Sequence, residues 1–268
     1  MLPDFEMIIH KFPAGEDITI IPIADVHLGA RECMEQQFIS FIGTMAEKPN
    51  VSFILGGDLI NNATRSGLSS IFEETIRPSQ QKKEMAKILE PIASRILCAV
   101  GGNHERRSGK DADDDPMYDI MCKINREDVY RESIAFLKLQ FGEPYKENGV
   151  RTDGDKRPSY VLAVTHGHGG GMMTSGAVLR GERFGYTMSD GVDALIFGHT
   201  HKPFTSVHGK IVVDPRNNTV KVKPFKVICM TSWLEYSAYA VQKMLLPNAH
   251  CLHTLTLCGD HKEMIVTM

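Results

Sequence analysis

The side chains that could carry out chemistry stand directly after apolar runs of the chain. Residues 101–105 read Gly-Gly-Asn-His-Glu and follow residues 95–100, an apolar run that is typical of a buried strand. Loops at the carboxyl ends of strands often bind ligands in open α/β sheets. Asn103 and His104 are therefore candidate functional residues. A polar loop after a strand has similar residue types, so this motif does not decide the matter alone.

Four further apolar runs end in the same way. They span residues 18–24, 51–55, 159–165 and 193–197, and the side chains that follow them are Asp25 and His27, Asp58, His166 and His168, and His199 and His201. Side chains two apart on an extended backbone face the same side, so Asp25 and His27 can chelate one ion. The alternative for Asp25 is that it only caps the next turn.

The residue types at these five strand ends suit a metal ion. Neutral imidazoles, carboxylates and the amide oxygen of Asn103 form a mixed nitrogen and oxygen ligand set, which binds Zn, Mn, Fe and similar ions. A single histidine at a strand end is usually structural. Five such ends in order predict a metal centre.

The elements that position these residues alternate between strands and helices. The periodicity predicts helices over residues 32–48, 69–94 with an interruption at Pro78, 117–141 in two pieces, and 176–186. Residues 61–66 are interpreted as the start of a helix and residues 142–158 as a surface hairpin or loop. Runs over 219–230 and 252–257 predict a second, antiparallel sheet, with Trp233, Tyr236 and Tyr239 in the core. We expect one domain over residues 1–268, with a motif-bearing core over 18–204 and the second-sheet strands over 205–268.

Composition indicates an ordinary globular protein. The chain has 268 residues, a formal net charge of −3 and 42% hydrophobic residues. Nucleic-acid binding would need a local basic patch, because the overall charge offers none. The six cysteines are scattered, which favours reduced thiols over a disulfide framework. The first ten residues lack a signal-peptide pattern and no run is long enough to cross a bilayer, so we expect a cytoplasmic protein without a membrane segment.

The order of the motifs resembles that of the calcineurin-like metallophosphoesterases. Their pattern is Asp-x-His, Gly-Asp, Gly-Asn-His-Glu/Asp, His and Gly-His-x-His, and every element is present here between Asp25 and His201. The resemblance implies an α/β fold, a four-layered α/β/β/α sandwich of two mixed β-sheets flanked by helices. It also implies a centre of two divalent metal ions, with Mn expected in activity and Zn, Fe, Ni or Mg as alternatives.

The same resemblance implies a role for each motif residue. One metal would be held by Asp25, His27 and His201, the other by Asn103, His166 and His199, and Asp58 would bridge the two. His166 is preferred over His168 as the ligand of the fourth motif, and His168 is then a candidate substrate-binding residue. His104 would protonate the leaving oxygen or stabilise the transition state. Glu105 is expected to orient the motif.

Two metal ions close together suit phosphoester hydrolysis. They lower the pKa of a bridging water and clamp a phosphoryl oxygen, so that the resulting hydroxide attacks in line. Protein phosphatases of this family read Gly-Asp-x-x-Asp-Arg-Gly, whereas Asn61 and Asn62 follow the Gly-Asp here. We therefore expect a phosphodiesterase, with DNA or a nucleotide as substrate, because residues 25–29 resemble the start of the DNA-repair exonuclease branch. The alternatives are a phosphomonoesterase and, in another class, a non-catalytic scaffold with the same fold.

A basic and then acidic stretch follows the Gly-Asn-His-Glu motif. Arg106, Arg107 and Lys110 could clamp phosphate oxygens, since a guanidinium group suits them, and Arg106 is the candidate substrate-binding residue among them. The alternative is a solvated loop. The aspartates over residues 111–115 are interpreted as the start signal of a helix near Met117.

Overall fold

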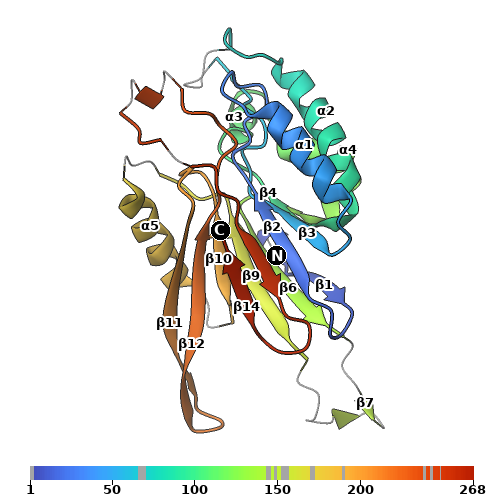
Figure 1. The fold of residues 1–268 in the computed structure, drawn as a ribbon, viewed down its shortest axis with the longest axis vertical. Coiled ribbons are helices and arrows are strands. Elements are labelled where there is room, and N and C mark those ends of the chain that lie inside the picture. The colour runs from blue at the N-terminus through green and yellow to red at the C-terminus, as the bar shows by residue number, and fades with distance from the viewer. Residues whose placement is uncertain are drawn as a thin grey trace.

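The computed structural model describes residues 3–65, 71–142, 146–147, 150–151, 157–169, 173–188, 191–237, 240–241, 244–247 and 249–268. Within these residues the chain forms two six-stranded sheets and a two-stranded hairpin. The two sheets pack against each other through a common core, and Figure 1 shows most helices on one side of the molecule and α5 on the other.

The first sheet carries three of the five motif-bearing strands. Its order is β14 (Met264–Thr267), β13 (Thr254–Leu257), β2 (Ile18–Ile23), β3 (Val51–Leu55), β4 (Ile96–Val100) and β5 (Tyr130–Arg131). Strands β2 to β5 are parallel, and β13 pairs antiparallel with both β2 and β14. The motifs that follow β2, β3 and β4 therefore emerge at one edge.

The second sheet carries the other two motif-bearing strands. Its order is β1 (Ile8–Phe12), β6 (Ile134–Phe141), β9 (Ser159–Thr165), β10 (Ala194–Phe197), β12 (Thr219–Cys229) and β11 (Phe204–Asp214). Strands β9, β10 and β12 are parallel, and β6 and β11 run antiparallel to their neighbours β9 and β12. Both sheets are thus mixed, as predicted.

The helices cover the outer faces of the two sheets. They are α1 (Glu35–Ala46), α2 (Pro78–Leu89), α3 (Arg106–Ala112), α4 (Pro116–Lys123) and α5 (Thr174–Thr187), with 3-10 turns η1 (Pro3–Phe5), η2 (Glu90–Arg95) and η3 (Glu127–Val129). No helix in the described part of the chain is long and apolar enough to cross a membrane. The predicted α/β sandwich of two mixed sheets flanked by helices is confirmed.

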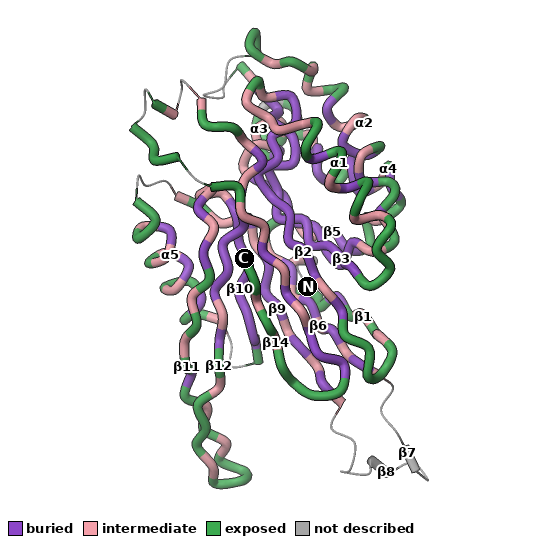
Figure 2. The backbone as a smooth tube through the Cα atoms, in the orientation of Figure 1, coloured by how far each residue is buried: buried purple, intermediate pink, exposed green. Residues whose placement is uncertain are grey.

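The core fills the space between the sheets and beneath α5. One hydrophobic cluster joins Ile20 and Ile54 of the first sheet to Leu137 and Leu162 of the second. A second cluster joins Ala177 of α5 to β10 and β12. Figure 2 shows buried backbone along the strands, and exposed backbone at the far end of the β11–β12 hairpin. All six cysteines are free thiols.

Two of the predicted helices are wrong in extent. The helix predicted from residue 69 begins at Pro78, and the described residues before it form turns. Arg77 is extended, with ψ of 141°, because a proline disfavours helical backbone in the residue before it. Residues 61–64, interpreted as the start of a helix, are irregular backbone instead.

The second half of the helix predicted over residues 117–141 is a strand. Helix α4 ends at Lys123, and β6 occupies Ile134–Phe141 with strictly alternating burial. An alternation of period two is the pattern of a strand with one face on the core. Within the aspartate run, Asp115 behaves as predicted, since its side chain accepts a hydrogen bond from the Tyr118 amide and caps α4, whereas residue 111 lies in α3 and Asp113 follows its end.

The strands after residue 204 do not form one separate sheet, which corrects that prediction. Strands β11 and β12 extend the second sheet beside β10, whereas β13 and β14 extend the first sheet beside β2. Residues 146–147 and 150–151 pair as the two strands β7 (Lys146–Glu147) and β8 (Val150–Arg151) of a hairpin. Trp233 is buried as predicted and Tyr236 is half exposed, while Tyr239 lies outside the described residues.

One buried hydroxyl ties the two sheets together. The Tyr160 hydroxyl of β9 lies 2.8 Å from the carbonyl oxygen of Cys258 and accepts a hydrogen bond from the Glu263 amide at 3.0 Å. Both partners belong to the turn between β13 and β14, in the other sheet. Tyr160 is 1% exposed, so its hydroxyl cannot replace these hydrogen bonds with bonds to bulk water.

We predict that Tyr160→Phe lowers the free energy of unfolding by about 1–3 kcal/mol, because buried backbone groups lose their partner. Urea denaturation measures the change. Tyr186→Phe is the matched control, since Tyr186 is 62% exposed, and it should have almost no effect. Equal stability of the two variants would show that the hydroxyl does not join the sheets.

Candidate metal centre

The ends of five strands converge on one place. Backbone hydrogen bonds link the loops directly: the Asp25 amide donates to the Gly57 carbonyl at 3.0 Å, and the His27 amide donates to the Asp58 carbonyl at 3.0 Å. The Gly198 amide donates to the His166 carbonyl at 3.0 Å. The loops after β2 and β3 are therefore locked to each other, as are those after β9 and β10.

The backbone at these loops is left-handed at most of the predicted ligands. The φ angles are 54° at Asp25, 52° at His27, 52° at Asp58, 67° at His199 and 55° at His201. Such a conformation costs a residue other than glycine about 1–2 kcal/mol, although Asp and His adopt it more readily than most residues. The surrounding structure holds five such residues at one place, and strain of this kind gathers at functional sites.

The first group of converging side chains consists of Asp25, His27 and His201. The His201 Nε2 lies 3.2 Å from Asp25 Oδ1 and 3.3 Å from His27 Nε2. The Asp25 carboxylate is fully buried, and its Oδ1 accepts no hydrogen bond. An orphaned carboxylate oxygen that faces two imidazoles suits a bound cation.

The second group consists of Asn103, His166 and His199. The Asn103 Oδ1 lies 3.0 Å from His166 Nε2 and 2.5 Å from His199 Nδ1, and these two ring nitrogens are 3.2 Å apart. The His166 Nδ1 donates to the Gly56 carbonyl at 2.7 Å, which turns Nε2 toward the group. One amide oxygen and two imidazole nitrogens therefore face a common point.

Asp58 lies between the two groups. Its Oδ2 is 3.2 Å from His166 Nε2 and 3.9 Å from His27 Nε2. Its Oδ1 accepts a hydrogen bond from the His104 amide at 2.7 Å. A single carboxylate oxygen thus approaches both groups.

The donor set fits a divalent cation in each group. Burial and the neighbouring His166 lower the pKa of His199 to about 4, and burial lowers the pKa of His27 well below its usual value. Burial alone would also lower the pKa of His166, but the Asp58 carboxylate outweighs it and raises that pKa to about 9. His27 and His199 are therefore neutral and offer lone pairs, and a cation beside Asp58 would replace the proton of His166. Zn, Mn and Fe bind such nitrogen and oxygen ligands.

His104 lies beside the first group, and its ring forms a further set with His27 and Asp58 whose possible ligand atoms lie within 4.8 Å of one another. Its ring stands edge-on to His27 with 4.3 Å between ring centroids, and its Nε2 is 3.9 Å from Asp58 Oδ2. Its Nδ1 is 2.8 Å from the Asn61 carbonyl oxygen. The Nε2 atom of His104 therefore lies on the side of the ring that faces the Asp58 carboxylate.

The Glu105 carboxylate joins the loops after β3 and β4 by hydrogen bonds. Its carboxylate accepts hydrogen bonds from the amides of Asp58 at 2.9 Å, Leu59 at 2.7 Å and Gly102 at 3.0 Å. Glu105 is 1% exposed. Burial and the nearby Asp58 charge raise its pKa to about 7. This contact matches the expectation that Glu105 orients the motif.

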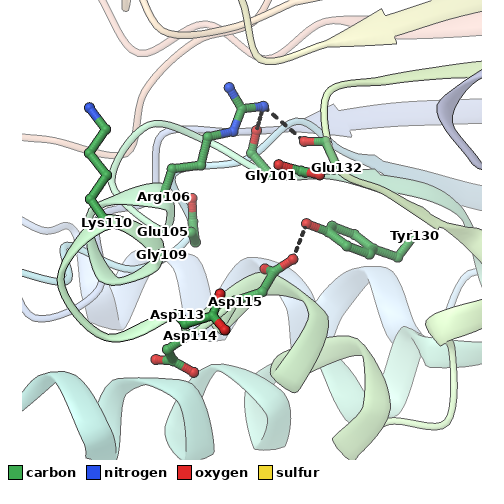
Figure 3. Close-up of a pocket in the computed structure, with 10 residues that line it drawn as sticks. All are labelled: Gly101, Glu105, Arg106, Gly109, Lys110, Asp113, Asp114, Asp115, Tyr130 and Glu132. Atoms are coloured by element: carbon green, nitrogen blue, oxygen red, sulfur yellow. Dashed lines mark hydrogen bonds between the residues drawn. The ribbon is translucent and has the colours of Figure 1, made fainter. Parts of the chain in front are cut away.

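The two candidate substrate-binding residues contribute no atom to the ligand groups. His168 is exposed, and its ring stacks against His199 with 6.0 Å between centroids. The Arg106 guanidinium donates to the carbonyl oxygens of Gly101 at 3.0 Å and Glu132 at 2.8 Å. Figure 3 shows Arg106 at a cavity of about 460 Å³ whose lining includes none of the seven predicted ligands.

Three residues near the metal centre contact His104 in ways that their residue types alone do not reveal. Arg107 contacts the His104 Nε2 at 2.8 Å, and Asn61 supplies the carbonyl that faces His104 Nδ1. The Asn62 side-chain Nδ2 donates to the His104 carbonyl at 2.8 Å. Arg107 reaches His104 because residues 104–107 form one turn, in which the Arg107 amide donates to the His104 carbonyl at 3.2 Å.

The arrangement is that of a class of metal-dependent hydrolases, in which an α/β sandwich brings two ligand groups together at its strand ends. The chain belongs to the calcineurin-like phosphoesterase family, whose sequence profile matches residues 18–203, more than half of its length. No curated protein matches the chain. The family and the His and Asp groups together support a hydrolase of phosphoesters that uses divalent metal ions.

We predict that Glu105→Gln weakens the metal centre although it removes no ligand. Half of the carboxylate becomes an NH₂ group that faces backbone amides, so at least one buried donor loses its acceptor, at a cost of about 1–3 kcal/mol. Metal affinity should fall about 10- to 100-fold, as it does when residues that support ligands are changed. Titration calorimetry with Mn²⁺ and thermal melting measure the two effects.

The control is Glu127→Gln, which changes an exposed carboxylate in the same way and should leave both values unchanged. Wild-type metal affinity in Glu105→Gln would mean that the loops keep their geometry without this carboxylate.

Proposed function

We propose that the protein is a dinuclear metal-dependent phosphodiesterase, with DNA or a nucleotide as its substrate and Mn²⁺ as its best activator. The observation that carries this proposal is the position of Asp58 Oδ2, within 4 Å of His166 Nε2 and His27 Nε2. In this assignment Asp58 is shared between two ions. The first is held by Asp25, His27 and His201, and the second by Asn103, His166 and His199.

The bound ions would supply an activated water and would neutralise charge on the phosphoryl oxygens. The protein's own contribution is position and protons. His104 places Nε2 beside the shared carboxylate, and Asn61 holds the opposite ring nitrogen. His104 is therefore the residue that would give a proton or hydrogen bond to the leaving oxygen.

The preference for a diester substrate rests on the hydrogen-bond partner of His104. Its Nδ1 faces a backbone carbonyl, whereas the protein-phosphatase pattern has an aspartate at position 61. The Asn61 side chain is turned elsewhere and donates to Glu74 Oε1 at 2.7 Å. The neutral partner of His104 differs from the aspartate of the protein-phosphatase pattern. This difference supports a substrate other than that of the protein phosphatases.

The substrate class is tested with protein stripped of metal and reconstituted with Mn²⁺. We predict turnover of bis-p-nitrophenyl phosphate faster than that of p-nitrophenyl phosphate, cleavage of single- or double-stranded DNA, and loss of all activity in EDTA. Restoration by Mn²⁺ shows that the loss comes from metal removal. Turnover of the monoester alone would make the protein a phosphomonoesterase, and inactivity on every substrate with two ions bound would favour a scaffold.

A second prediction concerns His104. We predict that His104→Ala keeps two ions per chain and lowers kcat about 10²- to 10⁴-fold, the range of general acid catalysis. Metal analysis and steady-state kinetics on the diester measure the two effects. His261→Ala, which removes an exposed histidine of the β13–β14 turn, is the control and should retain full activity. Loss of metal in His104→Ala would assign the residue to the ligands.

A further inference from the structure

The Arg107 guanidinium group contacts His104 Nε2, the nitrogen that is proposed to act on the leaving oxygen. One guanidinium nitrogen lies 2.8 Å from His104 Nε2, and the other terminal nitrogen lies 3.2 Å from the Asn61 carbonyl oxygen. A guanidinium group can only donate hydrogen bonds, so His104 Nε2 is an acceptor here. The His104 Nδ1 then carries the proton and donates to the same Asn61 carbonyl at 2.8 Å.

This contact places a positive charge next to the metal centre. His104 Nε2 is 3.9 Å from Asp58 Oδ2, the oxygen that approaches both ligand groups. Arg107 is half-buried, and its backbone amide bonds to the His104 carbonyl at 3.2 Å. Its position therefore follows from the Gly-Asn-His-Glu motif itself, since α3 begins directly after Glu105.

The neighbouring arginine is held elsewhere. The Arg106 guanidinium is bonded to the carbonyl oxygens of Gly101 and Glu132, at the cavity shown in Figure 3. Successive residues of a helix point about 100° apart, which follows from 3.6 residues per turn. Arg106 thus braces the backbone after β4, while Arg107 faces the metal centre.

We propose that Arg107 is the phosphate-binding residue of this centre and that it shields His104 until a phosphoryl group arrives. The inference rests on the proposed phosphoesterase function. A phosphoryl oxygen is a charged acceptor with which a guanidinium fork forms stronger hydrogen bonds than with a neutral imidazole. On binding, Arg107 exchanges His104 Nε2 for a phosphoryl oxygen, with no covalent bond made or broken. The exchange frees His104 Nε2, which then takes up a proton from solvent and gives it to the leaving oxygen.

The test uses the full-length protein loaded with Mn²⁺ and inorganic phosphate as the probe. Calorimetry should show phosphate affinity about 10- to 100-fold weaker in Arg107→Ala, with two ions still bound, because a charge-assisted contact is lost. The KM for bis-p-nitrophenyl phosphate should rise by a similar factor. Arg107→Lys should recover part of both effects, and free guanidinium should rescue Arg107→Ala more than sodium at equal ionic strength.

Two controls separate position from charge. Lys123→Ala removes a positive charge from the exposed surface of α4 and should bind phosphate as the wild type does. Arg106→Ala should lower stability with little change in phosphate affinity. Undiminished phosphate affinity in Arg107→Ala, or a loss confined to Arg106→Ala, would overturn the proposal.

The shielding of His104 has its own readout in metal-free protein. Nitrogen-15 spectra of labelled histidines should show the His104 Nδ1–H form in the wild type and a shifted Nε2 signal in Arg107→Ala. An unchanged Nε2 signal would refute the contact. If the wild type hydrolyses no phosphoester, the proposed function fails, yet phosphate titration and these spectra still decide the role of Arg107.

Discussion

The metal centre depends on one buried carboxylate that joins four separate segments. The Asp58 amide donates to Glu105, its carbonyl accepts from His27, its Oδ1 accepts from His104, and its Oδ2 faces His166. Burial alone would raise the pKa of Asp58, but the surrounding histidines outweigh this and hold it well below its usual value. Asp58 is thus a fixed negative charge around which the predicted ligands of both groups are arranged.

Such close approach of four segments is possible only where side chains are absent. A Cβ atom on Gly57 would lie 2.5 Å from the Gly102 amide nitrogen, and one on Gly102 would lie 2.1 Å from Asp58 Oδ1. The glycines of the Gly-Asp and Gly-Asn motifs are therefore required by contact between the loops after β3 and β4. Because the remaining ligands come from β9 and β10, the centre is complete only when both sheets have packed together.

Much of this site could be predicted because each motif is local and parallel strands end at a common edge. The seven predicted ligands lie together, and His166 rather than His168 reaches the second group. Residue types alone could not show that a backbone carbonyl of Asn61 faces His104, since any residue offers that atom. The choice between Arg106 and Arg107 depended on the rotation of a short helix whose start was not visible in the sequence.

Two of the fold errors have a common physical origin. Residues 134–141 contain helix-compatible residues such as Leu137 and Lys138, yet their period-two burial is fixed by pairing with β1 and β9, which are distant in sequence. The same holds for the C-terminal strands, whose partners β10 and β2 decide to which sheet they belong. For the C-terminal strands, the local pattern thus predicts that a strand exists, but tertiary contacts decide to which sheet it belongs.

The most direct test of the shared carboxylate is anomalous diffraction from crystals of the Mn-loaded protein. The account predicts two Mn peaks about 3.5–4 Å apart, the spacing of dinuclear sites, one beside Asp25 and His201 and the other beside Asn103 and His199, with Asp58 in contact with both. A single peak, or two peaks of which Asp58 contacts only one, would contradict it.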